Sequence, residues 1–252
     1  MINTKKAIKS IIKTLGKNKK CPFVSALILA GGKSERMNGA SKQLMSVGGA
    51  PVVVLSAKAF DDCPDVSEIV VVCRDDEKSA VEALMKDYGV KKFKCAATGG
   101  ETRFDSMKRG LEASFVDADY IAVHDAARCL ITPEQISSVV AAAKKHGAAI
   151  AAAKTTDTVK LVDKSGIITS TVDRSAAWSA QTPQIFKKAM LEVGAYMRSA
   201  TDAPPTDDAM LVEAIGFKVA VVDCGYDNIK ITTPKDIAVA NAILAQRRSN
   251  NE

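Results

Sequence analysis

The sequence lacks the features of a zinc protein, of a disulfide-rich secreted domain and of a membrane protein. Its six cysteines form no CxxC pair, and only two histidines are present. Because a zinc site needs a cluster of such ligands, none is expected, and the scattered cysteines are interpreted as reduced thiols. No run approaches the roughly 18 consecutive apolar residues of a spanning helix, so we expect no membrane span.

Outside the N-terminal segment the sequence has no net positive charge. The formal net charge is +6, from 35 basic and 29 acidic residues. Seven of the lysines and none of the acids lie in the first twenty positions, which leaves 28 basic residues against 29 acidic ones. A near-neutral body has no broad phosphate-neutralising surface, so we expect no nucleic-acid partner.

Residues 1–22 are predicted to be a basic N-terminal extension. Ile8, Ile11, Ile12 and Leu15 have helical spacing, so a short helix on an anionic surface is one interpretation, and a solvated extension is the simpler one. Lysines interrupt every apolar run, which argues against a signal peptide. A cytoplasmic location is therefore expected.

From residue 23 the chain alternates short apolar runs with helical patterns. Strands are predicted at 23–29, 68–73, 92–96, 120–124, 148–153 and 218–223. Helices are predicted at 51–60, 76–88, 102–113, 133–146, 187–197, 207–215 and 234–247, two of them starting at Thr-Pro. The alternation predicts one Rossmann-like α/β domain over 23–252, with helices on both faces of a mostly parallel sheet.

The stretch from about 154 to 184 breaks this alternation. Residues 156–162 and 167–172 read as two strands around a turn, so a β-arm inserted into the domain is predicted. A hairpin has too little core to be stable alone. We therefore expect the arm to pack on a second subunit, giving a homodimer.

The first predicted strand is followed by a glycine-rich loop from Gly31 to Lys42. Ligands of open α/β sheets bind at the carboxyl ends of strands, and small residues let backbone N–H groups approach phosphate oxygens. Arg36 and Lys42 add positive charge. A Gly-Gly turn after a strand is common without any ligand, but the two cations favour a triphosphate-binding loop.

The motif HDAAR, residues 124–128, ends the fourth predicted strand. Asp125 at that position suits a magnesium ion held against phosphates, since this ion prefers one or two carboxylates plus phosphate oxygens. The alternative is that Asp125 caps the loop by accepting backbone hydrogen bonds. His124 is expected to be structural.

Two further motifs lie at predicted strand ends. In GGETRFDS, residues 99–106, a glycine pair opens a helix, and helix N-termini favour anions. Arg103 and Ser106 lie three residues apart, on one helix face. In DNIK, Lys230 supplies one more cation, which by itself is equally compatible with a solvated surface charge.

Together the motifs LILAGGKSERM with SKQ, GGETRFDS, HDAAR, DTVK, TVDRS, AQTPQ, TDD and DNIKITTP resemble those of the 2-C-methyl-D-erythritol 4-phosphate cytidylyltransferases of the non-mevalonate isoprenoid pathway. The similarity covers about residues 23–247. It implies a fold of the nucleotide-diphospho-sugar transferase type. The implied reaction transfers CMP from CTP to a sugar-alcohol phosphate and releases pyrophosphate, with Mg²⁺ or another divalent cation as cofactor.

The resemblance also implies residue roles. Nucleotide contacts are implied for Ala30, Gly31, Gly32, Gly99, Gly100, Arg103, Ser106, Asp125 and Ala126. Acceptor contacts are implied for Asp125, Thr158, Arg174, Thr182, Thr206 and Lys230. Catalytic roles are implied for Arg36, Lys42, Arg174 and Lys230, with Asp125 at the metal. Thr158 and Arg174 would reach the neighbouring subunit's site from the arm.

Three rival functions remain on sequence grounds. One of them, a structural or membrane-tethering protein, would rest on the lysine-rich extension alone. A ribitol-5-phosphate cytidylyltransferase shares the glycine-rich loop and the NIKITTP ending, and its acceptor is also a polyol phosphate. A non-catalytic nucleotide-binding regulator would lack Arg36 or Lys42, and both are present.

Overall fold

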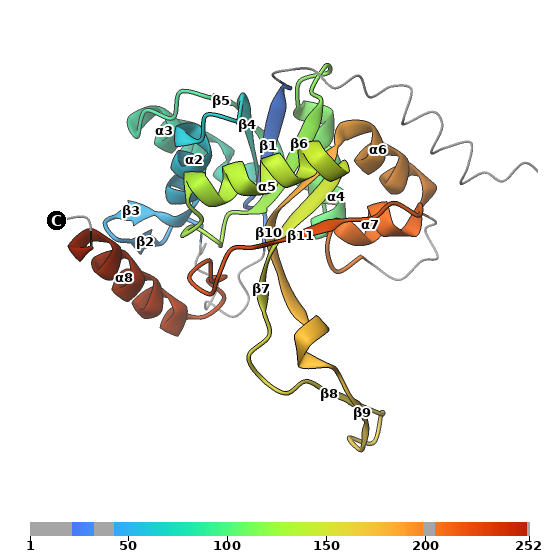
Figure 1. The fold of residues 1–252 in the computed structure, drawn as a ribbon. Coiled ribbons are helices and arrows are strands. Elements are labelled where there is room, and N and C mark those ends of the chain that lie inside the picture. The colour runs from blue at the N-terminus through green and yellow to red at the C-terminus, as the bar shows by residue number, and fades with distance from the viewer. Residues whose placement is uncertain (1–21, 33–42, 199–204, 251–252) are drawn as a thin grey trace, which may run out of the picture.

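A seven-stranded sheet forms the centre of the protein (Figure 1). The computed structural model describes residues 22–32, 43–198 and 205–250. The sheet strands are β1 (Val24–Leu29), β4 (Glu68–Cys73), β5 (Phe93–Thr98), β6 (Tyr120–Asp125), β7 (Ala148–Lys154), β10 (Trp178–Lys187) and β11 (Ala220–Asp223). Their order is β11-β7-β10-β6-β1-β4-β5, and only the pairs that include β10 are antiparallel. The predicted single-domain α/β fold with a mostly parallel sheet is confirmed.

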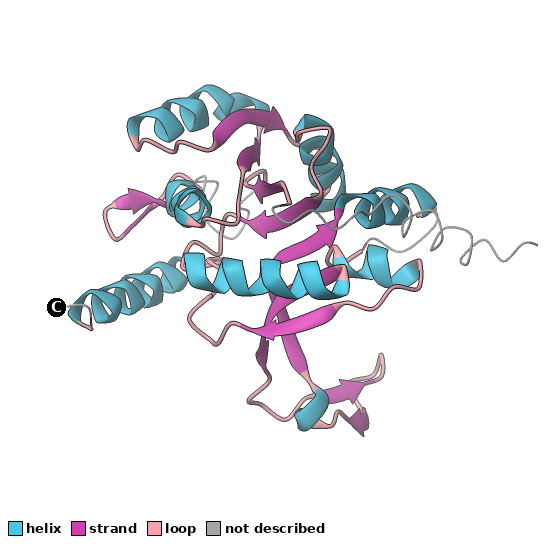
Figure 2. Ribbon diagram, turned by 45° about the horizontal axis from the view of Figure 1, so that its top comes forward, coloured by secondary structure: helices cyan, strands magenta, loops and turns pink. Residues whose placement is uncertain are grey.

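Helices cover both faces of this sheet (Figure 2). One face packs against α2 (Val52–Asp62), α3 (Lys78–Asp87), which follows the short helix η2 (Asp75–Glu77), and α5 (Pro133–His146). The other packs against α4 (Arg103–Ala113), α6 (Lys188–Met197) and α7 (Ala209–Ala214). Ala26 and Ile28 of β1 enter the first core, and Leu27 and Leu29 enter the second. Burial on both sides explains why β1 is apolar at every position except Ser25.

The last helix, α8 (Pro234–Ser249), lies beside the sheet and packs on a small hairpin (Figure 1). The hairpin strands are β2 (Ser46–Val47) and β3 (Ala50–Pro51). Both α5 and α8 begin at the predicted Thr-Pro pairs, Thr132-Pro133 and Thr233-Pro234. Within the described residues, no helix has the length and apolar content needed to span a membrane.

The inserted arm projects away from the sheet (Figure 1). Its tip contains β8 (Lys160–Val162) and β9 (Ile168–Thr171), followed by the short helix η3 (Arg174–Ala176). The two tip strands are shorter than the predicted 156–162 and 167–172. Large apolar side chains are exposed along it, namely Val159, Leu161, Val162, Ile167 and Ile168.

Strand β10 was not predicted, and it changes where the arm ends. Residues 181–184 were assigned to the arm, but they are buried in the central sheet between β6 and β7. The polar sequence AQTPQ hides this strand, because buried strands are normally apolar and proline is rare in central ones. A register shift between Ala180 and Gln184 accommodates the proline.

The strand register brings four carboxyl ends to one edge of the sheet. Leu29 of β1 is opposite both Val72 of β4 and Asp125 of β6, and Cys73 of β4 is opposite Thr98 of β5. Loops that follow these strands therefore meet, and this edge is where ligands of open α/β sheets bind.

Candidate active site

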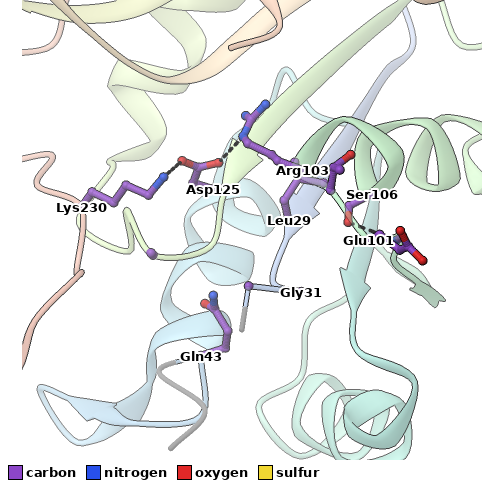
Figure 3. Close-up of a pocket in the computed structure, with 12 residues that line it drawn as sticks. Leu29, Gly31, Gln43, Glu101, Arg103, Ser106, Asp125 and Lys230 are labelled. Carbon is purple, nitrogen blue, oxygen red and sulfur yellow. Dashed lines mark hydrogen bonds and ion pairs between the residues drawn. The ribbon is translucent and has the colours of Figure 1, made fainter. Parts of the chain in front are cut away.

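A cavity of about 350 Å³ opens at this edge of the sheet (Figure 3). Its lining residues are Leu29, Gly31, Gly32, Gln43, Gly100, Glu101, Thr102, Arg103, Ser106, Asp125, Ala127 and Lys230. They come from the glycine-rich loop, GGETRFDS, HDAAR and DNIK. The structure thus brings together motifs that are up to about 200 positions apart.

The glycine-rich loop enters the cavity directly after β1. Ala30 is buried, and its N–H donates to the carbonyl of Val72 at 2.6 Å, so it ties the loop to β4. Gly31 and Gly32 line the cavity. The two predicted cations of this loop, Arg36 and Lys42, lie outside the described residues.

The segment before α4 is held by short-range contacts that need glycine. The Gly99 N–H donates to the carbonyl of Cys73 at 2.8 Å, and the Gly100 N–H donates to Ser106 Oγ at 3.2 Å. A methyl group added to Gly100 would overlap the side chain of Asp105. The glycines therefore let the chain approach the first turn of α4 closely.

Capping at the start of α4 places Arg103 in the cavity. The Thr102 hydroxyl accepts from the Asp105 N–H at 3.0 Å, so the helix begins at Arg103. From this first turn the guanidinium reaches two carboxylates. Arg103 Nε lies 3.1 Å from Asp125 Oδ1, and Nη1 lies 2.8 Å from Asp208 Oδ2. Burial disfavours the charged guanidinium, but the two carboxylates raise the pKa of Arg103.

Asp125 accepts from two cations at once. Its Oδ1 contacts Arg103, and its Oδ2 accepts from Lys230 Nζ at 2.6 Å (Figure 3). Burial alone would raise the pKa of Asp125, but the adjacent Arg103 and Lys230 hold it well below its usual range. The carboxylate is thus ionised, and its hydrogen bonds go to cationic side chains, not to loop amides as in the capping alternative.

The charges form an alternating row from Asp208 through Arg103 and Asp125 to Lys230. Asp208 is buried at the start of α7, and its N–H donates to Gln184 Oε1 at 2.9 Å. Each charge faces one of opposite sign, which offsets the cost of burial. The row presents cationic groups at the edge where a phosphate ligand would bind.

His124 and Thr182 form hydrogen bonds that hold Asp125 in position. The Asp125 N–H donates to Thr182 Oγ1 at 3.0 Å, and the same hydroxyl lies 3.1 Å from His124 Nδ1. Burial lowers the pKa of His124 to about 3, so this ring is neutral at physiological pH. Thr182 and Ala126 are also buried. These residues position Asp125 and do not line the cavity.

Lys230 is placed by a polar network behind its loop. Asn228, which is fully buried, donates to Gln181 Oε1 at 2.9 Å and to the Thr182 carbonyl at 3.0 Å. Arg128 Nη1 donates to the Asn228 carbonyl at 2.8 Å. Hydrogen bonds therefore connect the three motifs HDAAR, AQTPQ and DNIK.

Besides the buried Thr182, three predicted acceptor residues do not line the cavity of their own chain. Thr158 and Arg174 are exposed on the arm, where Arg174 Nη1 donates to the Thr156 carbonyl at 3.3 Å. Thr206 is exposed before α7, and its hydroxyl contacts Met210 Sδ at 3.2 Å. Any role for these residues requires a second chain or a substrate that extends beyond the cavity.

Sequence reasoning missed three features of the site. Gln43 and Glu101 line the cavity, although only their neighbours were singled out. Asp208 pairs with Arg103. The TDD motif contained Asp208, but nothing in the sequence indicated its partner.

The fold and the site define an α/β enzyme of the nucleotide-binding class, with glycine turns, a helix N-terminus and paired cations at the carboxyl edge of the sheet. The profile of the family described as 2-C-methyl-D-erythritol 4-phosphate cytidylyltransferase matches residues 24–246. The chain belongs to this family, whose members are nucleotidyltransferases.

Individual relatives are similar in sequence to this chain over nearly its whole length. A protein of that name from Synechococcus sp. (strain WH7803) is 41% identical over 222 residues, covering 88% of this chain and 99% of the relative. Another, from Endomicrobium trichonymphae, is 43% identical over 221 residues, covering 87% and 98%. The crystal structure of 4-diphosphocytidyl-2C-methyl-D-erythritol synthase from Anaerococcus prevotii DSM 20548 is similar with a TM-score of 0.80 and 31% identity, covering 89% of this chain and 96% of that one.

Proposed function

We propose that this chain transfers CMP from CTP to 2-C-methyl-D-erythritol 4-phosphate, giving 4-diphosphocytidyl-2-C-methyl-D-erythritol and pyrophosphate. The observation that carries the proposal is the contact of Asp125 with both Arg103 and Lys230 in the cavity, in a chain of this family. Cations gathered around one carboxylate suit a reaction between two anionic substrates.

In the proposed mechanism, an oxygen of the acceptor's phosphate attacks the α-phosphorus of CTP in line, and pyrophosphate leaves. Such transfers are catalysed mainly by positioning and charge stabilisation. Arg36 and Lys42 stabilise the charge that develops on the α-phosphate. Gly31, Gly32, Gly100, Arg103 and Ser106 hold the nucleotide, and Lys230 orients the acceptor's phosphate.

A divalent cation, Mg²⁺ in the simplest case, is proposed as the cofactor. The described residues include no group of three or more His, Cys, Asp or Glu side chains that could hold a metal. Asp125 fits as a ligand that would share the ion with substrate phosphates, which is the mode this ion prefers. When bound, the ion would neutralise phosphate charge. Asp227 is directed elsewhere, because Arg247 Nη2 lies 3.6 Å from its carboxylate.

A homodimer through the arm is proposed as the active form. Ile167 is 65% exposed and Ile168 is 58% exposed, which is unusual for side chains of this size in a tip of so few residues. A second chain that covers this tip would remove that apolar surface from water. It would also give Thr158 and Arg174 a site to serve in the neighbouring subunit.

The test is pyrophosphate release by the purified chain with CTP and Mg²⁺. Methylerythritol phosphate should support turnover, and omission of the acceptor should abolish it. Ribitol 5-phosphate, the acceptor of the rival enzyme, should support turnover at least ~10-fold more slowly if hydrogen bonds to the acceptor set specificity. Faster turnover with ribitol 5-phosphate would overturn the acceptor assignment, and no release with either acceptor would overturn the proposed reaction.

A further inference from the structure

Gln43 is a buried polar residue in the cavity wall that the mechanism above does not use. It is 3% exposed, and its side chain points into the cavity beside Gly31 (Figure 3). The side-chain oxygen Oε1 is buried and has no hydrogen-bond partner among residues 22–32, 43–198 and 205–250. Buried polar atoms are nearly always paired, so an unpaired acceptor in a ligand cavity needs an explanation.

The fold fixes the position of Gln43 through its backbone. The Val53 N–H donates to the Gln43 carbonyl at 3.0 Å, and the Val52 N–H donates to the Met45 carbonyl at 3.0 Å. Both donors belong to the first turn of α2, and Val53 is part of the core under β1. The side chain is therefore held at the cavity whether or not its amide is paired.

A second buried glutamine shows what a structural role looks like in this chain. Gln184 is 1% exposed, and its Oε1 accepts from the N–H groups of Asp208 and Ala209 at 2.9 and 3.0 Å. Its Nε2 donates to Asp207 Oδ2 at 3.0 Å. Gln184 thus joins β10 to α7, whereas the side-chain oxygen of Gln43 accepts no hydrogen bond from the part of the chain that the structure describes. Leucine would fill the volume of Gln43 without burying an unpaired acceptor.

The missing partner must be able to donate a hydrogen bond. Phosphate oxygens can only accept hydrogen bonds, so they cannot pair with Oε1. A hydroxyl group donates to Oε1 and also accepts from Nε2, so it pairs with the amide in either orientation. Both substrates of the proposed reaction carry such groups, on the ribose of the nucleotide and on the polyol chain of the acceptor.

We propose that Gln43 is a further substrate-binding residue whose side-chain amide pairs with a substrate hydroxyl. The inference rests on the proposed function, since it takes its ligand chemistry from those two substrates. It predicts that Gln43 contributes to affinity and selectivity for hydroxylated ligands and contributes little to folding.

The experiment compares Gln43→Leu with wild type and with the matched variant Gln184→Leu. Thermal unfolding should show Gln43→Leu as stable as wild type or more stable, whereas Gln184→Leu should melt at a lower temperature. Steady-state kinetics with CTP and methylerythritol phosphate should show the KM of one substrate raised about 5- to 10-fold in Gln43→Leu, the effect of one lost hydrogen bond.

Substrate analogues distinguish the two sources of the hydroxyl. If the ribose is the partner, 2′-deoxy-CTP or 3′-deoxy-CTP should bind wild type more weakly than CTP does, and this difference should disappear in Gln43→Leu. If the acceptor is the partner, the KM for methylerythritol phosphate should rise and that for CTP should not.

Unchanged KM values for both substrates in Gln43→Leu would overturn the inference, and so would a melting temperature that falls as far as in Gln184→Leu. In either case, turnover by the wild type would still uphold the proposed function. A wild type that releases no pyrophosphate would overturn both.

Discussion

The carboxylate of Asp125 accepts a hydrogen bond from Lys230 Nζ at 2.6 Å, across 105 positions of sequence. The contact joins the end of β6 to the loop before α8. Because Arg103 occupies the other oxygen of Asp125, three motifs converge on one side chain. This convergence places cations where two phosphate-bearing substrates would react.

Replacement of Arg36 or Lys42 by alanine should lower kcat by ~10²- to 10³-fold, because each removes a charge that stabilises the transition state. The melting temperature and the far-ultraviolet circular dichroism spectrum should stay those of wild type. Lys235→Ala, which removes an exposed lysine of α8, is the control and should keep full turnover. Near-normal turnover in Arg36→Ala or Lys42→Ala would refute the assignment of that residue.

Mixed dimers test whether the arm completes the neighbouring site. A chain with Arg174→Ala and a chain with Lys42→Ala should each be inactive alone, yet their heterodimer should regain about half of wild-type activity, since one of its two sites is intact. Differently tagged chains, co-expressed and purified over both tags, allow this measurement. A heterodimer as inactive as its parents would show that Arg174 does not complete the neighbouring site and acts within its own chain.

Two glycines of the cavity should respond differently to a methyl group. At Gly31 the added carbon meets its nearest neighbours at 3.8 Å, an ordinary contact, so Gly31→Ala should keep the melting temperature and weaken CTP binding by narrowing the cavity. At Gly100 the methyl group would overlap Asp105, so Gly100→Ala should lower the melting temperature as well. Calorimetric titration with CTP and thermal unfolding measure both effects. Equal melting temperatures for the two variants would contradict the contacts described at α4.

The start of α8 should make stability depend on pH. Asp236 accepts from the N–H groups of Thr232 and Thr233 at 2.7 and 2.8 Å. Partial burial opposes ionisation, but these hydrogen bonds hold the pKa of Asp236 below its usual range. Because the folded pKa is depressed, the stabilisation is complete above the unfolded value of about 4 and is lost as pH falls below it.

Asp236→Asn should therefore melt below wild type at pH 7, and the gap should close as the pH falls through about 4 toward the folded pKa. Melting curves of both proteins between pH 7 and pH 3 provide the comparison. A gap of constant size over that range would mean that the charge of Asp236 is not responsible.

The sequence predicted most of the fold because its signals are local. Buried strands such as β4 are mostly apolar, with an uninterrupted run from Ile69 to Cys73, and Thr-Pro pairs mark where α5 and α8 begin. Strand β10 was not predicted because its central residues are polar. The hydrogen-bond partners of these residues lie in loops that are distant in sequence. Gln181, for example, pairs with Asn228, which no periodicity reveals.

The part of the site that lies at strand ends and in recognisable motifs could be predicted from the sequence. Gly31, Gly100, Arg103, Asp125 and Lys230, which were singled out from motifs, all line one cavity. The ion pair of Arg103 with Asp208 depends on how α7 packs, and the environment of the Gln43 side-chain oxygen, unpaired among the described residues, depends on how α2 packs. Neither feature can be predicted from local sequence patterns.

A double-mutant cycle on Asp125 and Lys230 tests most directly whether this carboxylate organises the reacting edge. The measurement is kcat/KM for CTP and methylerythritol phosphate in Asp125→Asn, Lys230→Ala and the double variant. Residues in contact typically couple by 0.5–3 kcal/mol, which is about 2- to 150-fold, so the activity loss of the double variant should be smaller than the product of the two single losses by more than about twofold. Single effects that multiply to give the double variant, within about twofold, would contradict the role given to the Asp125–Lys230 contact.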